Sequence, residues 1–176
     1  MTLRFEPMDE AAARAIHGWR YEPPYDVYDL AEEPLLGLLR AFLDPKNAYY
    51  TVFDEKGQLV AYCCFGPDAQ VPGGDYGPPA LDVGLGLHPD LTGQGQGLSY
   101  VQAVLDFARR MPATGPTAGT LRSASPAGEG QPPAFRVTVA AFNRRARRVW
   151  ENAGFRIVQR FERNVDALPF VIMVGP

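Results

Sequence analysis

Apolar and polar positions along the chain predict alternating strands and helices. Short runs rich in β-branched and aromatic residues predict strands, and apolar residues that recur every three or four positions predict helices. The expected strands are Leu3–Phe5, Tyr49–Phe53, Leu59–Phe65, Ala80–Leu87, Phe135–Val139, Phe155–Glu162 and Phe170–Val174. The expected helices are Asp9–Trp19, Pro34–Leu43, Gly95–Met111 and Asn143–Ala153. This order predicts an α/β fold built on one sheet of mixed strand direction.

The predicted elements form one domain over residues 1–176, a length that suits a single core. Residues 112–133 differ in composition, with five prolines, four glycines and only Leu121 as a large apolar residue. Such a segment buries little apolar surface, so we expect a flexible Pro/Gly-rich loop within the domain. It is not a domain boundary, because the strand and helix that follow are needed to complete the sheet.

The strand predicted at 80–87 alternates with unusual regularity. Its leucines and valine share one face, and the other face carries Asp82, Gly84, Gly86 and His88. Glycine weakens a strand. Two glycines on one face leave bare backbone, which is typical of a place where a ligand or another chain segment comes close.

A glycine-rich turn follows this strand, after Pro89. The run Thr92-Gly93-Gln94-Gly95-Gln96-Gly97 leads into a predicted helix. Free N–H groups at a helix start, together with the helix dipole, favour an anion, and a diphosphate fits them. The run is not a Walker loop, because the lysine is missing, and a Rossmann fingerprint would need a third glycine at Leu98 or Tyr100.

This turn resembles the first motif of the GNAT N-acetyltransferase family, R/Q-x-x-G-x-G/A after a strand, aligned on Thr92 to Gly97. A second segment resembles the family's other motif, N-x-x-A-x-x-x-Y-x-x-x-G-F. There Asn143, Ala146, Gly154 and Phe155 are in register. The order of elements agrees over essentially the whole chain.

The resemblance implies a mixed, mostly antiparallel central sheet of six to seven strands, flanked by about four helices and splayed between strands 4 and 5. It implies that acetyl-coenzyme A binds as co-substrate, with its pantetheine arm in the splay and its diphosphate on the glycine turn. The residues implied to bind it are Leu85, Gly86, Leu87, Thr92, Gly93, Gln94, Gly95, Gln96, Gly97, Leu98, Asn143 and Trp150.

The activity implied is transfer of an acetyl group to a primary amine of a small molecule or peptide by direct attack. The backbone N–H of Leu85 would stabilise the oxyanion. Asp82 is the candidate general base, and its alternative role is that of a strand-end aspartate in solvent or paired with an arginine. No metal site is expected.

The sequence departs from the family at two motif positions. Thr92 stands where Arg or Gln is usual, and Trp150 stands where the family has a tyrosine proposed to protonate the leaving thiolate. An indole N–H donates a hydrogen bond but does not transfer a proton, so Trp150 either contacts the cofactor or only packs. The alternatives are that the thiolate leaves unassisted or through water, or that another group such as Tyr100 serves. The alternative function is a non-catalytic coenzyme A-binding or regulatory module of the same fold.

Charge is distributed unevenly along the chain. The net charge is −3, with −7 over residues 1–80 and +4 over residues 81–176. This division suits a cationic acceptor on one side and an anionic cofactor on the other. Overall acidity argues against nucleic acid as a partner. We expect acceptor selectivity from the aromatic and acidic segments Trp19–Glu33 and Gly66–Pro79, and a monomer or homodimer.

Cysteine usage and hydropathy indicate a cytoplasmic protein. Cys63 and Cys64 are adjacent, so in a strand they point to opposite faces and form neither a disulfide nor a metal site. No apolar run reaches the length of a membrane span, and Met1–Glu10 lacks the features of a signal peptide.

Overall fold

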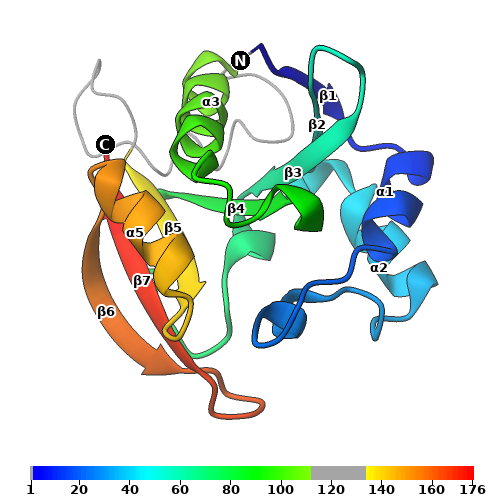
Figure 1. The fold of residues 1–176 in the computed structure, drawn as a ribbon. Helices are drawn as coiled ribbons and strands as arrows, with labels where there is room; N and C mark the ends of the chain where they lie inside the picture. The colour runs from blue at the N-terminus through cyan, green and yellow to red at the C-terminus, as the bar shows by residue number, and fades with distance from the viewer. Residues whose placement is uncertain (1, 112–133) are drawn as a thin grey trace.

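The computed structural model describes residues 2–111 and 134–176, which form one seven-stranded sheet with helices on both faces (Figure 1). The strands are β1 (Arg4–Pro7), β2 (Tyr50–Phe53), β3 (Leu59–Phe65), β4 (Leu81–Leu87), β5 (Phe135–Ala140), β6 (Arg156–Glu162) and β7 (Pro169–Gly175). Their order is β1-β2-β3-β4-β5-β7-β6, and every neighbouring pair is antiparallel except β4–β5. The predicted mixed sheet is confirmed. The predicted flexible loop at 112–133 lies outside the described residues.

All four predicted helices are present. They are α1 (Glu10–His17), α2 (Leu35–Phe42), α3 (Gly97–Arg110) and α5 (Arg144–Asn152). Single 3₁₀ turns, which the sequence pattern did not predict, are η1 (Tyr25–Tyr28), η2 (Pro45–Asn47), η3 (Pro67–Ala69) and η4 (Pro89–Leu91). Asp9 caps α1 as expected, its Oδ1 accepting from the N–H of Ala12 at 2.7 Å. No helix among residues 2–111 and 134–176 is long and apolar enough to cross a membrane.

Helix α3 begins at Gly97, two residues later than predicted. Gly93 and Gly95 have φ of 75° and 77°, which is a left-handed conformation that cannot continue into an α-helix. These two glycines therefore hold the turn apart from the helix and leave it as an exposed loop in front of α3.

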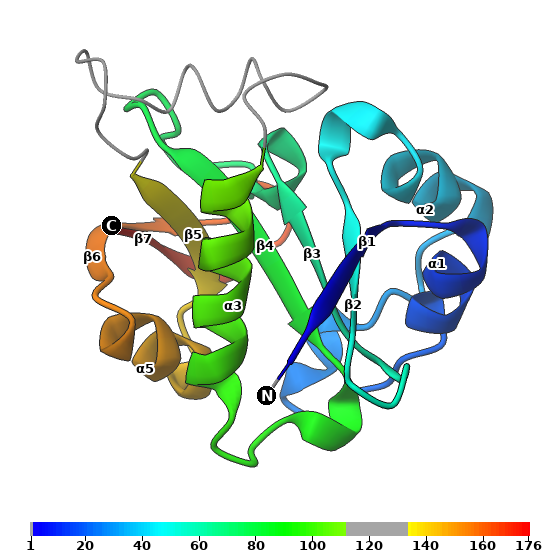
Figure 2. The ribbon, with the colours of Figure 1, turned by 90° about the horizontal axis from the view of Figure 1, so that it is seen from above.

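The sheet separates two apolar cores because neighbouring side chains of a strand point to opposite faces. Phe65 and Val83 pack with Val104 of α3 in one core. On the other face Tyr62 packs against Trp19, and both lie against the apolar side of α1 and α2. Figure 2 shows α3 and α5 together, with α1 and α2 set apart beyond β1.

The two glycines of β4 face the α1–α2 side, where side chains of β3 cover them. A Cβ on Gly84 would lie 2.6 Å from Cys64 Sγ, and one on Gly86 would lie 2.2 Å from Tyr62 Cε1. The sequence left open whether a ligand or another chain segment comes close to these glycines. The structure shows the close approach of another chain segment.

Strands β4 and β5 pair over a very short length. Only Leu81 with Phe135 and Asp82 with Arg136 are in register, and beyond them the two strands diverge. The predicted splay between strands 4 and 5 is therefore present, and it opens toward the C-terminal ends of both strands (Figure 1).

Candidate functional site

The splay leaves one backbone edge of β4 without a strand partner. Gly66 N–H donates to Asp82 O, and His88 N–H donates to Val60 O, so the even-numbered residues of β4 pair with β3. The odd-numbered residues face the other way, since Leu81 N–H donates to Ala134 O before β5. The N–H groups of Leu85 and Leu87 therefore point into the splay, where an extended ligand can pair with them as an added strand does.

The glycine loop between η4 and α3 offers a row of unused donors. None of the backbone N–H groups from Gly93 to Leu98 donates a hydrogen bond to another group in the described part of the chain. The loop is exposed from Thr92 to Gln96. Free N–H groups in a loop that opens a helix form an anion site. The loop thus has the free donors that the predicted diphosphate site requires, and it follows the open edge of β4 after the single turn η4.

Two polar side chains of this loop are already used in local contacts. Thr92 Oγ1 donates to Pro89 O at 2.8 Å, and the Gln94 amide donates to Asp90 O. Their hydroxyl and amide groups therefore stabilise the turn itself. Neither supplies the positive charge that Arg would give at position 92.

Helix α5 borders the splay from the β5 side. Asn143 caps it, with Oδ1 accepting from Ala146 N–H at 3.0 Å, and its Nδ2 donates to Tyr28 Oη at 3.1 Å. Trp150 is only 4% exposed and packs edge-on against Phe155, with ring centroids 4.7 Å apart. The geometry places Asn143 at the opening of the splay and Trp150 in the core.

The segment from Tyr21 to Tyr28 bridges the two sides of the splay. Tyr21 Oη donates to Leu87 O at 2.8 Å on β4, while Tyr28 reaches Asn143 at the start of α5. Burial raises the pKa of both phenols, with a further rise at Tyr21 from the Asp29 charge. Both hydroxyls therefore remain protonated at neutral pH, and Tyr21 remains the donor to the Leu87 carbonyl.

Asp82 lies at the closed end of the splay in a buried ion pair. Its oxygens accept from Arg136 Nε at 2.6 Å and Arg136 Nη2 at 2.8 Å, and Gln70 Nε2 also donates to it at 2.8 Å. Both side chains are at most 5% exposed. Because Arg136 engages both carboxylate oxygens and the side chain is buried, the geometry favours the arginine-paired alternative. Its role as general base stays a prediction.

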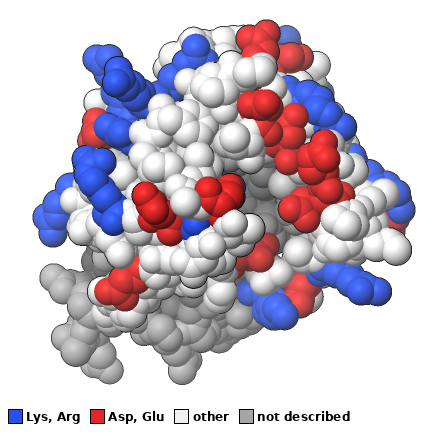
Figure 3. Space-filling view, turned by 90° about the horizontal axis from the view of Figure 1, so that it is seen from below, with Lys and Arg blue, Asp and Glu red and all other residues white. Residues whose placement is uncertain are grey.

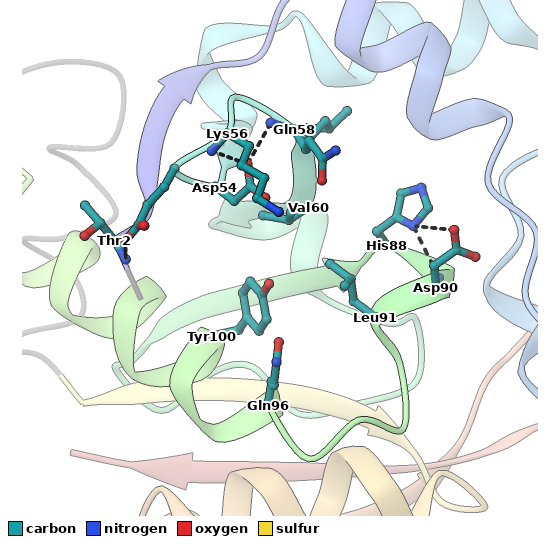
Figure 4. Close-up of a pocket in the computed structure, with 12 residues that line it drawn as sticks. Thr2, Asp54, Lys56, Gln58, Val60, His88, Asp90, Leu91, Gln96 and Tyr100 are labelled. Atoms are coloured by element: carbon teal, nitrogen blue, oxygen red, sulfur yellow. Dashed lines mark hydrogen bonds and ion pairs between the residues drawn. The ribbon is translucent and has the colours of Figure 1, made fainter.

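A separate hollow of about 730 Å³ lies on the far side of the α3 start, between the β2–β3 turn and η4 (Figure 4). Gln96 and Tyr100 point into it, toward the strand end at Val60. Its lining contains three carboxylates, Asp54, Glu55 and Asp90, against one lysine. This charge balance does not suit an anionic diphosphate, so we do not assign the cofactor to it.

Acidic side chains surround a hollow on another face. Figure 3, which views Figure 1 from below, shows Asp and Glu side chains gathered near the middle of this face, and Lys and Arg mostly toward its edges. Within the segments expected to select the acceptor, Tyr49 Oη donates to Asp68 Oδ2, and Tyr76 Oη bonds Thr138 Oγ1. These polar groups lie on the same side of the sheet as Gly84 and Asp82.

Sequence reasoning did not predict the contacts that three residues make at the site. Tyr21 and Tyr28 lie in the segment Trp19–Glu33, which was expected to select the acceptor, but no pattern in it predicts a hydrogen bond from Tyr21 to a strand residue 66 positions away. Arg145 belongs to the arginine-rich stretch 144–148, whose sequence predicts mostly a solvated helix face, with one arginine as a candidate for the 3′-phosphate of the cofactor. Its Nη1 instead lies 3.3 Å from the position of a Cβ on Gly93. Only the spacing of Arg145 from the N-cap Asn143, one residue inside the helix start, pointed toward the loop.

Comparisons with known proteins agree with this geometry. Residues 11–117 match the family model described as Acetyltransferase (GNAT) family. A chimera of the Vibrio cholerae spermidine N-acetyltransferase SpeG with hSSAT is 16% identical, with a TM-score of 0.67 over 99% of this chain and 95% of that one. AAC(6')-Ib in complex with ribostamycin and coenzyme A is 15% identical, with a TM-score of 0.67 over 99% and 93%. The aminoglycoside N(6')acetyltransferase of Legionella pneumophila is 16% identical, with a TM-score of 0.65 over 98% and 91%. No curated protein sequence matches the chain.

Proposed function

Because the chain belongs to the acetyltransferase (GNAT) family, we propose that it is an N-acetyltransferase that moves an acetyl group from acetyl-coenzyme A to a primary amine of a small molecule or peptide. The observation that carries this proposal is the continuity of two features. The open backbone edge at Leu85 and Leu87 is followed, after the single turn η4, by the loop of free N–H groups from Gly93 to Leu98.

These two features divide the binding of the cofactor between them. The amides of the pantetheine arm pair with the backbone of Leu85 and Leu87, and the diphosphate accepts from the loop N–H groups. The thioester carbonyl lies within reach of the Leu85 N–H, which donates to its oxygen as negative charge develops there. A neutral amine attacks the carbonyl carbon directly, and the carbon–sulfur bond breaks to release the thiol.

The amine approaches from the α1–α2 face, where Asp82 and the segment Tyr21–Tyr28 lie. Acidic side chains on that side of the molecule favour a cationic acceptor in solution (Figure 3). The names of the solved relatives refer to spermidine and to aminoglycosides, so a panel of amines should include a polyamine, an aminoglycoside and a peptide α-amine.

The first test is thiol release from acetyl-coenzyme A with that panel, checked by the mass of one added acetyl group on the product. We expect release with at least one amine and calorimetric binding of coenzyme A in its absence. If no amine supports release and coenzyme A does not bind, the proposal fails. Binding without release by any amine would favour the non-catalytic alternative.

A matched pair of variants locates the cofactor. Gly95 has a φ of 77° and open space around the position of a Cβ, and Asn and Asp tolerate this conformation equally. Gly95→Asp adds a negative charge beside the diphosphate and should weaken coenzyme A binding by about tenfold or more. Gly95→Asn has the same shape without the charge and should bind coenzyme A much more tightly than Gly95→Asp does. Equal affinities would mean that the diphosphate lies elsewhere.

A further inference from the structure

The glycine loop lacks a positive charge of its own. Its residues from Thr92 to Gly97 include no lysine or arginine, and the side chains of Thr92 and Gln94 are bound to Pro89 O and Asp90 O. No basic residue stands in the first turn of α3. If the loop binds a diphosphate, as the proposed function requires, any side-chain positive charge beside it comes from another element.

Arg145, in the first turn of α5, is the cation that reaches this loop. A Cβ on Gly93 would lie 3.3 Å from Arg145 Nη1 and 3.8 Å from Arg145 Cζ. Across residues 2–111 and 134–176, Arg145 takes part in no ion pair and no hydrogen bond. Its guanidinium N–H groups are therefore available at the edge of the anion site.

Packing between the two helices sets this position. Val149 follows Arg145 by four residues, so both side chains lie on the same face of α5. A Cβ on Gly97 would lie 2.9 Å from Val149 Cγ2, which means that only glycine at the start of α3 lets α5 approach this closely. The contact places the preceding turn of α5, which carries Arg145, beside the loop. Figure 2 shows α5 next to α3.

A ring from η1 holds the guanidinium. Arg145 Cζ lies over the Tyr25 ring at 5.1 Å from its centroid, and Tyr25 in turn lies 6.0 Å from the Phe142 ring. A guanidinium stacked on an aromatic ring uses its flat face and leaves its N–H groups free at the edge. The stacking reduces the freedom that Arg145 would lose on binding an anion.

We propose that Arg145 binds the diphosphate of the cofactor and supplies, from α5, the positive charge that Thr92 does not supply in the loop. Tyr25 acts as a positioning residue for Arg145. This inference rests on the proposed function, because it assigns a residue to the same cofactor site. It links that site to η1, whose last residue Tyr28 borders the splay together with the preceding Tyr21.

The test compares two probes, coenzyme A and pantetheine, which lacks the diphosphate and the nucleotide. Arg145→Gln should weaken coenzyme A binding by about tenfold and leave pantetheine binding unchanged, because a charge-assisted hydrogen bond to phosphate is lost. Arg144→Gln is the matched control. It removes the same charge from the same turn, from an exposed side chain one position earlier in the helix, and should bind both ligands like wild type.

Salt gives a second readout. Screening weakens exposed ionic contacts, so the affinity of wild type for coenzyme A should fall with added salt more steeply than that of Arg145→Gln. For the positioning role, Tyr25→Phe should keep wild-type affinity, and Tyr25→Ala should lose about threefold because the ring under the guanidinium is removed.

The outcomes separate the inference from the proposed function. If wild type binds no coenzyme A, the proposed function fails. If wild type binds it and Arg145→Gln binds equally well, the inference alone fails. Equal weakening of coenzyme A and pantetheine by Arg145→Gln would show that Arg145 acts by supporting the fold of the site, which also overturns the inference. If Arg144→Gln weakened coenzyme A binding as much as Arg145→Gln does, the effect would be one of general charge, and the inference would fail.

Discussion

Asp82 and Arg136 are the last residues of β4 and β5 that stand in register, and their side chains form a buried bidentate ion pair at 2.6 and 2.8 Å. The pair closes the narrow end of the splay. Arg136 Nη1 also donates to Pro78 O at 2.8 Å, so the guanidinium joins both strands to the segment that precedes β4. The position at which the sheet divides is therefore fixed by side chains as well as by backbone pairing.

Breaking this pair should be costly. Asp82→Asn leaves the Arg136 charge buried without its counter-charge, and we expect a loss of about 3 to 5 kcal/mol in the free energy of unfolding, measured by urea denaturation. Replacing both residues by apolar ones, Asp82→Leu with Arg136→Met, should lose much less. If that double variant folds and keeps its turnover with the accepted amine, Asp82 is not the general base.

Trp150 should behave as a packing residue. Trp150→Ala is expected to cost about 3 to 5 kcal/mol in the free energy of unfolding, because it leaves a cavity against Phe155. Trp150→Phe keeps most of the volume and should keep the affinity for coenzyme A, measured by calorimetry. A Trp150→Phe variant of normal stability but weakened coenzyme A binding would contradict this interpretation and point to a direct cofactor contact.

Gly84 should tolerate a methyl group only if its neighbour Cys64 is replaced by a smaller residue. Because a Cβ at this position meets Cys64 Sγ at 2.6 Å, Gly84→Ala should cost about 1 to 3 kcal/mol of stability. Combining it with Cys64→Ala should cost less than the sum of the two single changes. Gly37→Ala in α2 is the control. It meets no atom within 4 Å and should stabilise the protein by about 0.5 to 1 kcal/mol.

The cysteines should be unreactive in the folded protein. Burial raises the pKa of the Cys64 thiol to about 12 and also raises that of Cys63, so neither forms a thiolate at pH 8. A thiol-reactive dye should label both only after unfolding. Between the unfolded pKa of about 8.5 and the folded value, the unfolded state releases protons that the folded state keeps. Stability should therefore fall as pH rises through this range, and less steeply in Cys64→Ala.

Much of the fold could be predicted from the sequence because its signals are local. Alternation in Leu81–Leu87, the N-cap Asp9 and the start of α5 after Asn143 depend only on neighbouring residues, and each lies where it was expected. The exact start of α3 was wrong by two residues. The reason is also local. Glycine at position 95 allows the positive φ that it adopts but does not require it, so the sequence does not fix where the helix begins.

The parts that could not be predicted depend on contacts between distant segments. The sequence does not reveal that Arg136 is the arginine beside Asp82, 54 positions away, or that Tyr21 donates to Leu87. Nor does it distinguish Arg145 from the three other arginines of the same helix. Such choices depend on helix rotation and on the angle between elements, which tertiary packing sets.

The alternating direction of the β4 backbone should be visible one residue at a time in amide hydrogen exchange. Gly84 and Gly86 point their amides toward β3 and should exchange slowly, while Leu85 and Leu87, with no strand opposite, should exchange quickly. An extended ligand in the splay would slow only the second set. Ligand binding would then change the amide protection along β4 from alternating slow and fast exchange to uniformly slow exchange.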